Sequence, residues 1–94
     1  MDYELQEIPL EKIKHCLDGV REPKVDAGIE QLATSIKDVG LMQSIVVSLN
    51  SKTNFYCVRV GHRRLLAYRY LNEKFPDDEY DKIFSRIIPE PEEC

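Results

Sequence analysis

The residues best suited to catalysis or ligand binding form one short segment, Gly61-His62-Arg63-Arg64, which we call the arginine box. It separates a run of aromatic and β-branched residues, Phe55 to Val60, from a stretch with helical spacing of apolar residues. A glycine at such a junction lets the chain turn sharply and lets a ligand approach the backbone. The first N–H groups of the following helix have no intrahelical partner and lie at the positive end of its dipole. Together with two guanidinium groups, whose donors can each bind two phosphate oxygens, they predict a phosphate site.

Each of these residues also has an alternative interpretation. The arginines can be the solvated start of a helix, paired with nearby acids, but cations at a helix N-terminus oppose the dipole, and this conflict favours an anionic ligand. His62 is a candidate phosphate donor or proton shuttle, unless it only caps the junction between strand and helix. Glu30 is the second candidate catalytic residue, since it stands with Asp26 near the start of the preceding helix and the fold could bring them to the box. No set of metal ligands is expected.

The distribution of charge points to a local anion site and not to a broad nucleic-acid surface. The chain of 94 residues carries a net charge of −4, whereas nucleic-acid-binding domains are typically basic. Residues 54–75 nevertheless hold five basic side chains and a single acid. One concentrated basic segment in an acidic protein is typical of a site for a small anion.

Cysteine usage and the lack of long apolar runs predict a cytoplasmic protein. Cys16, Cys57 and Cys94 stand far apart without a C-x-x-C pair, so we expect reduced thiols without a role and no zinc site, with Cys57 packed in the core. No apolar run reaches the roughly 18 residues of a membrane span. The acidic N-terminus lacks the apolar region of a secretory signal.

The elements that must position the arginine box follow from periodicity and turn residues. Strands are expected over Tyr3–Leu10, Ile45–Val47, Phe55–Val60 and Lys82–Ile88, and helices over Asp26–Val39 and His62–Leu71. Asp26 is the expected N-cap of the first helix, and Gly40 is expected to end it. This order predicts one α+β domain, residues 1–94, with a small mixed sheet covered by helices and a flexible tail over residues 89–94.

The same patterns predict which apolar side chains are buried. They are Leu5, Ile8 and Leu10 in the first strand, Ile29, Leu32, Ala33, Ile36 and Val39 in the first helix, the whole of Ile45–Val47, and Leu66, Ala67, Tyr70 and Leu71 in the second helix. The β-branched run Ile45–Val47 is expected to be buried on both of its faces.

Several segments, taken in order, resemble the ParB/sulfiredoxin superfamily, in particular the N-terminal domain of ParB-type partition proteins. The segments are Ile8-Pro9-Leu10-Glu11-Lys12-Ile13, a loop with Arg21, the stretch Gln31 to Val47, and the box itself continued to Ala67. The resemblance covers residues 8 to about 88 at similar spacing. It implies a ParB/sulfiredoxin-like fold with a small mixed sheet and two main helices.

The resemblance also implies a nucleotide pocket that serves DNA partition, plasmid maintenance or a related DNA transaction. In ParB-like domains the glycine–arginine box cradles the triphosphate of CTP, so Gly61, His62, Arg63 and Arg64 would hold phosphates here. Gln43, Ser44 and Arg21 would help to build the pocket. The implied ligand is a nucleotide, CTP or ATP, bound with or without Mg²⁺.

Departures from the family pattern limit what the resemblance implies. His62 stands where ParB proteins usually carry Glu and sulfiredoxins their catalytic Cys, so sulfiredoxin activity is not expected, because imidazole cannot form the sulfinyl intermediate. Ser44 replaces the usual Pro, and the second phosphate motif, the DNA-reading helix-turn-helix and the dimerisation domain have no counterpart. DNA contacts would therefore need missing domains or partner proteins, and a homodimer is possible. Two alternatives to a nucleotide-binding module stay open. One is an enzyme on the same fold, a nucleotide hydrolase, nuclease or small-molecule kinase, and the other is a structural or protein-interaction domain with a vestigial box.

Overall fold

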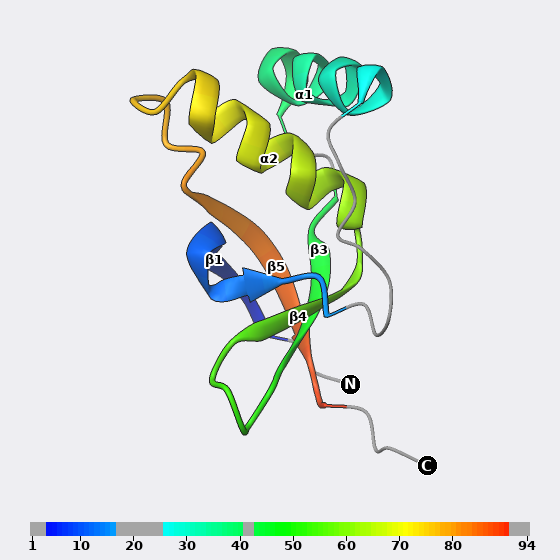
Figure 1. Ribbon diagram of the computed structural model, residues 1–94, viewed down its shortest axis with the longest axis vertical. Coiled ribbons are helices and arrows are strands. Elements are labelled where there is room, and N and C mark those ends of the chain that lie inside the picture. The colour runs from blue at the N-terminus through cyan, green and yellow to red at the C-terminus, as the bar shows by residue number, and fades with distance from the viewer. Residues whose placement is uncertain (1–3, 17–25, 41–42, 91–94) are drawn as a thin grey trace.

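The fold places five strands beneath two helices of equal length (Figure 1). A computed structural model describes residues 4–16, 26–40 and 43–90. The strands are β1 (Glu4–Pro9), β2 (Ile13–Lys14), β3 (Ile45–Leu49), β4 (Tyr56–Val60) and β5 (Lys82–Ile88). The helices are α1 (Ala27–Val39) and α2 (His62–Lys74), and a 3-10 turn, Leu10–Lys12, separates β1 from β2.

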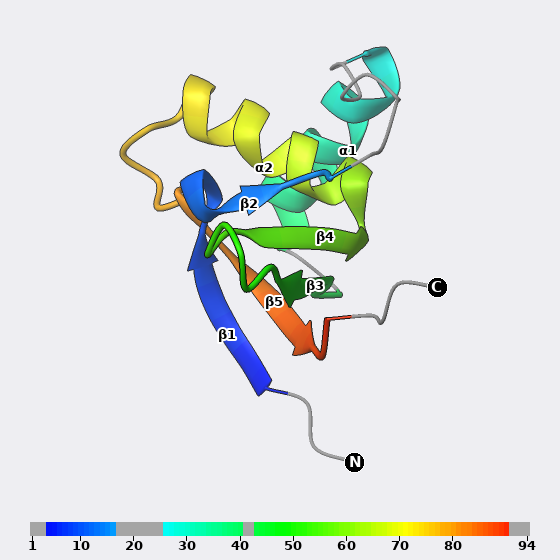
Figure 2. The same ribbon diagram turned by 60° about the horizontal axis from the view of Figure 1, so that its bottom comes forward.

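The strands form one mixed sheet in the order β1-β5-β3-β4-β2. β1 and β5 are antiparallel, β5 and β3 are parallel, and β3 and β4 form an antiparallel hairpin. β2 pairs with β4 in parallel at one edge, through Ile13 beside Tyr56 and Lys14 beside Cys57 (Figure 2). The sheet and its two helices confirm the predicted α+β class.

The core has two parts, because α2 is buried on two sides. Leu65 points toward the sheet and packs with side chains of β1, β3, β4 and β5. Leu66, Ala67 and Leu71 face the other way and pack against Ile29, Ala33 and Ile36 of α1. The sheet, α2 and α1 are therefore three successive layers, with α1 on the outside (Figure 1). This arrangement fixes the start of α2, and with it the arginine box, between the sheet and α1.

Two predicted core positions, Leu5 and Val39, are wrong, and three others, Leu32, Val46 and Tyr70, are only half-buried. Leu5 is 58% exposed, because side chains alternate across a strand and Leu5 lies on the face opposite to buried Ile8. Val39 is 66% exposed at the last residue of α1, beyond the reach of α2. Val46 is only half-buried, although its neighbours Ile45, Val47 and Ser48 in β3 are buried.

The structure also extends the predicted elements. α2 continues to Lys74, three residues beyond the predicted end, and Leu65 forms a second buried side that faces the sheet. β2 and the 3-10 turn were not expected, since two paired residues leave no periodic signal in a sequence. The predicted ends of α1 are confirmed, with Asp26 as N-cap and Gly40 at a φ of 85° after the last turn. The expected tail over residues 89–94 lies mostly outside the described residues.

Cys16 and Cys57 form a disulfide, so the expectation of reduced thiols is wrong for this pair. The expected burial of Cys57 is confirmed, with 3% of the residue exposed. Cys16 follows β2, and the parallel pairing of β2 with β4 brings the two Cα atoms to 5.5 Å, although 41 positions separate them in the sequence. Cys94 lies outside the described residues. No helix in the described part of the chain has the length and apolar character needed to cross a membrane.

Candidate functional site

Gly61 makes the turn from β4 into α2 in a left-handed conformation that favours glycine. Its φ of 100° and ψ of 29° lie in the left-handed region, where a side chain is strained. A Cβ on Gly61 would also lie 2.7 Å from Cγ2 of Ile45, the buried first residue of β3. The same residue is the N-cap of α2, so no side chain caps the first N–H groups of this helix. These groups remain available to a ligand.

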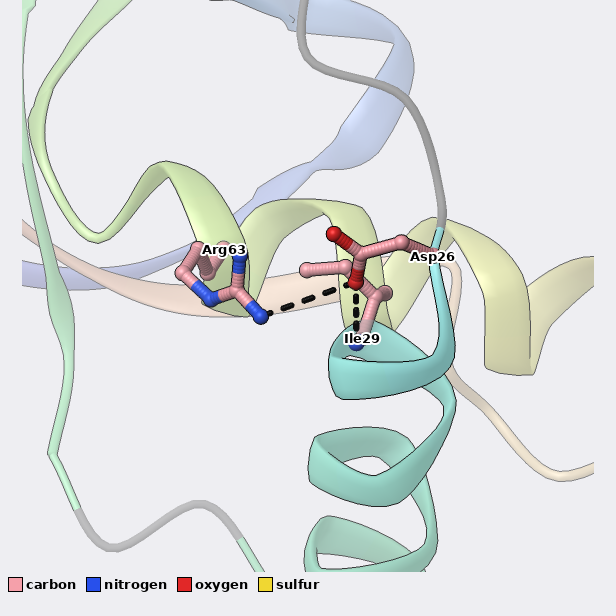
Figure 3. A network of polar contacts seen from close by, with 3 residues as sticks. All are labelled: Asp26, Ile29 and Arg63. Carbon is pink, nitrogen blue, oxygen red and sulfur yellow. Dashed lines mark hydrogen bonds and ion pairs between the residues drawn. The ribbon is translucent and has the colours of Figure 1, made fainter.

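Arg63 reaches from α2 to the start of α1 (Figure 3). Its Nη2 lies 3.6 Å from Oδ1 of Asp26, and both side chains are largely exposed. The same oxygen of Asp26 accepts a hydrogen bond of 2.9 Å from the backbone N–H of Ile29, which caps α1. A Cβ on Gly28 would lie 2.5 Å from Arg63 Nη2, so the absence of a side chain there leaves room for the guanidinium. One carboxylate thus serves both the cap of α1 and the arginine of α2.

Arg64 contacts the segment that precedes β3. Its Nη2 donates a hydrogen bond of 3.0 Å to Oε1 of Gln43. Ser44, which is half-buried, follows Gln43 and precedes Ile45, whose side chain packs on Gly61. The fold therefore brings Gln43 and Ser44 beside the box, and it gives each arginine one neutral or acidic partner.

His62 contacts a second histidine that sequence reasoning missed. Its Nδ1 lies 2.8 Å from Nδ1 of His15, and the two rings stack with centroids 5.0 Å apart. Because one Nδ1 must donate and the other accept, both rings cannot be doubly protonated while this bond exists. Burial lowers the pKa of His62 below its usual value, which keeps this ring neutral near pH 7. His15 is 1% exposed and stands 47 positions before His62, so no local pattern could have indicated the pair.

The remaining sequence candidates are not gathered at the box. Glu30 accepts a hydrogen bond of 3.4 Å from the hydroxyl of Tyr70, which lies eight positions after His62 and so about 12 Å along α2. The carboxylate that the fold places beside an arginine of the box is that of Asp26. Arg21 lies outside the described residues. Among the described residues, no three His, Cys, Asp or Glu side chains lie close enough together to hold a metal ion.

Two open hollows lie elsewhere on the molecule, and neither is lined by a residue of the box. One of about 460 Å³ lies between β2 and α2, where Arg69 Nη2 donates to the carbonyl of Ile13. The other, of about 690 Å³, lies at the acidic loop that follows α2 and is lined mainly by carboxylates and tyrosines. Carboxylates repel phosphate, so the second hollow is unsuited to the predicted ligand.

Comparison with known families gives one match, to the ParB N-terminal domain, over residues 2–76. This range contains the whole arginine box, α1 and the segment before β3. No curated protein matches the chain.

Among solved structures, the chain is similar to ParB from Caulobacter crescentus and to sulfiredoxin from Arabidopsis thaliana. ParB complexed with CTP-gamma-S matches with a TM-score of 0.70 and 21% identity over 95% of this chain and 46% of that one. ParB complexed to the centromeric parS site matches with a TM-score of 0.63 and 20% identity over 94% and 40%. Sulfiredoxin matches with a TM-score of 0.70 and 26% identity over 93% and 86%. The chain thus spans less than half of each ParB chain, and at these identities the ParB likenesses show the fold alone.

Proposed function

The chain belongs to the ParB N-terminal domain family, and on that premise we propose that it binds the phosphates of a nucleotide at the arginine box. One observation carries the proposal. α2 begins without a side-chain cap and without an acid in its first turn, and two arginines stand there instead. Such a helix start is locally unfavourable for the free protein and favourable for a bound polyanion.

The neighbours of the arginines suit them to exchange partners on binding. The Arg63–Asp26 pair is 3.6 Å long and exposed, so it contributes little to stability and competes weakly with a phosphate. The Arg64–Gln43 hydrogen bond pairs a guanidinium with a neutral acceptor, and no ion pair joins Arg64 to an acid among the described residues. Phosphate oxygens would therefore accept hydrogen bonds from the two guanidinium groups and from the free N–H groups of α2.

The nucleotide is proposed to be CTP or ATP, with or without Mg²⁺. The complex of the Caulobacter crescentus ParB with CTP-gamma-S supports the first of these. A role in DNA partition, plasmid maintenance or a related transaction is supported by the family and by the ParB complex with parS. Contacts with DNA would come from further domains or partner proteins, because the chain spans less than half of those relatives.

Titration calorimetry with CTP, ATP, ADP and inorganic phosphate, each with and without Mg²⁺, tests the proposal. The Arg63→Ala/Arg64→Ala variant should lose about 100-fold or more in nucleotide affinity, since each charge-assisted interaction contributes about 1.5–3 kcal/mol. A Lys52→Ala/Lys82→Ala variant is the matched control, because it removes the same charge at exposed sites in the hairpin turn and in β5.

Two results would contradict the phosphate site. One is no binding at millimolar nucleotide, and the other is equal affinity in the arginine variant and the wild type. A phosphate-release assay on the same samples separates the two remaining functions. Binding without release indicates a binding module, and steady release that the arginine variant lacks indicates a hydrolase.

A further inference from the structure

The disulfide lies at one edge of the sheet, with one half accessible and the other buried. Cys57 belongs to β4 and is 3% exposed, whereas Cys16 is an exposed residue that follows β2. β2 has only two residues that pair with β4, Ile13 and Lys14. Among the described residues, the disulfide follows these two pairs as the next connection between the β2 segment and β4, and exposed Cys16 is the side from which an external thiol would approach.

Cys16 is held in a backbone conformation that a cysteine seldom adopts. Its φ is 54°, in the left-handed region where the Cβ of a non-glycine residue is crowded. Such a conformation persists only where the surroundings impose it. The covalent bond to Cys57 is one constraint on this residue, and reduction removes it.

A direct path leads from the disulfide to the arginine box. His15 is the residue before Cys16, and its buried imidazole forms the 2.8 Å contact with His62. His62 is the first residue of α2 and the neighbour of Arg63. A change in the backbone at Cys16 therefore acts on the ring that fixes His62 beside the phosphate site.

We propose that the Cys16–Cys57 disulfide is a thiol–disulfide exchange site whose substrate is a dithiol, and that its redox state controls phosphate binding at the arginine box. This inference rests on the proposed function. In the oxidised protein, His15 holds His62 in place and the box is ordered for its ligand. In the reduced protein, Cys16 relaxes, the His15–His62 contact loosens and the ligand has to order the box itself.

One dithiol supplies all the electrons and protons that reduction of the disulfide requires. A thiolate of the dithiol attacks Sγ of Cys16, the bond between the two protein sulfurs breaks, and Cys57 leaves as a thiolate that takes up a proton. The second thiolate of the reductant then attacks the mixed disulfide and releases Cys16, which is protonated in turn. The protein disulfide gains two electrons and two protons, and the dithiol becomes a disulfide.

The experiment uses a Cys94→Ser protein, in which only the two paired cysteines remain. Thiol counting establishes the oxidised and the dithiothreitol-reduced forms, and circular dichroism shows that both are folded. The ring signals of His62 are then followed by NMR, and nucleotide affinity is measured by calorimetry. We expect reduction to shift the His62 signals and to weaken nucleotide binding on the order of threefold to tenfold, the cost of ordering one side chain or two. Reoxidation should restore both values.

Two variants separate the disulfide from general stability. Cys16→Ser in the same background should bind like the reduced form and should not respond to dithiothreitol. His15→Gln, with the disulfide intact, should weaken binding to a similar extent, because it removes the contact with His62 and leaves the backbone restrained. If His15→Gln binds like the wild type, the proposed path through the two histidines is wrong.

The outcomes distinguish this inference from the proposed function. Equal affinities in two folded forms that both bind nucleotide overturn the redox control and leave the phosphate site standing. Absence of binding in both forms overturns the proposed function. His62 signals that do not change on reduction overturn the coupling whatever the affinities are.

Discussion

The two helices have equal length, and their N-termini are built in opposite ways. α1 begins with an acidic N-cap, Asp26, whose side chain accepts from the backbone of Ile29, and it carries Glu30 in its first turn. α2 begins with Gly61, has no side-chain cap and carries two arginines in its first turn. The first arrangement gives one of the free N–H groups a side-chain acceptor and places acids at the positive end of the dipole, whereas the second has neither a cap nor an acid.

The difference separates residues that stabilise the fold, at the start of α1, from residues that we propose for ligand binding, at the start of α2. The start of α1 is complete without a ligand, so its residues serve the fold. The start of α2 has no side-chain cap and no acid in its first turn, so its residues are the ones that we propose for the ligand site. The two starts meet at the Arg63–Asp26 pair (Figure 3), and substitutions at each can therefore separate the two purposes.

The largest effect is expected from Gly61→Ala. An alanine there must adopt a left-handed φ and would place its Cβ 2.7 Å from Ile45, so we expect a loss of about 2–4 kcal/mol in the free energy of unfolding. Urea denaturation measures the loss, and nucleotide affinity should fall with it because the box is displaced. A variant as stable as the wild type would show that the turn does not require a left-handed conformation at Gly61.

Asp26→Ala should have the next largest effect on stability. It removes the acceptor of the Ile29 N–H, which typically costs about 1 kcal/mol, while Asp26→Asn keeps an acceptor and should lose less than half of that. Both variants should bind phosphate more tightly in low salt, because a carboxylate 3.6 Å from Arg63 is gone. Weaker binding by Asp26→Asn would mean that Asp26 positions Arg63 and does not compete with the ligand.

Gly28→Ala sharpens the comparison, because the same substitution as at Gly61 should have the opposite effect on stability. Alanine is the better helix former, so we expect a gain of about 0.5 kcal/mol. Its Cβ would lie 2.5 Å from Arg63 Nη2, the end of a flexible side chain that can move away. Nucleotide affinity should therefore fall severalfold.

Ser35→Ala is the matched control for Gly28→Ala, since it raises helix propensity on an exposed face of α1 and is distant in sequence from the cap. It should increase stability without changing affinity. Equal affinities in the two variants would contradict the close approach of Arg63 to Gly28.

The smallest effect is expected from the titration of His62. Burial lowers its pKa in the folded protein, so below the usual value of 6.5 the unfolded chain binds the proton more readily. This part of the stability is therefore present above pH 6.5 and is lost as the pH falls from 6.5 through the lower folded pKa. Urea denaturation at pH 8 and pH 5.5 should show a smaller pH dependence in His62→Gln than in the wild type. Equal dependence in the two proteins would show that His62 does not contribute.

Local patterns predicted the parts of the site that are close together in the sequence. The arginine box stands at a predicted strand–helix junction, and the junction is where the structure has it. The cap of α1 was also predicted, because capping residues act within one turn. The partners of the box were out of reach. Asp26 beside Arg63 depends on how α1 packs on α2, which the sequence left open.

Errors in the predicted core have a similar origin. Leu5 was assigned to the core from its apolar character, yet β1 turns it to the outer face. Val46 was assigned from a β-branched run, but it is only half-buried, at the point where the register between β3 and β4 shifts. In both cases, burial depends on which layer covers each face, and apolar character alone does not state this.

The sequence by itself predicted the family, both helices and four of the five strands, because these depend on periodicity, capping and motifs within a few residues. It also singled out the arginine box as a candidate phosphate site. Only the tertiary structure decided the contacts of that segment. The sheet order places β2 beside β4, which brings Cys16 to Cys57 and His15 to His62 across more than 40 positions. Contacts at such separations are set by how layers and strands pack, so the residues that would control the site became visible only in the fold.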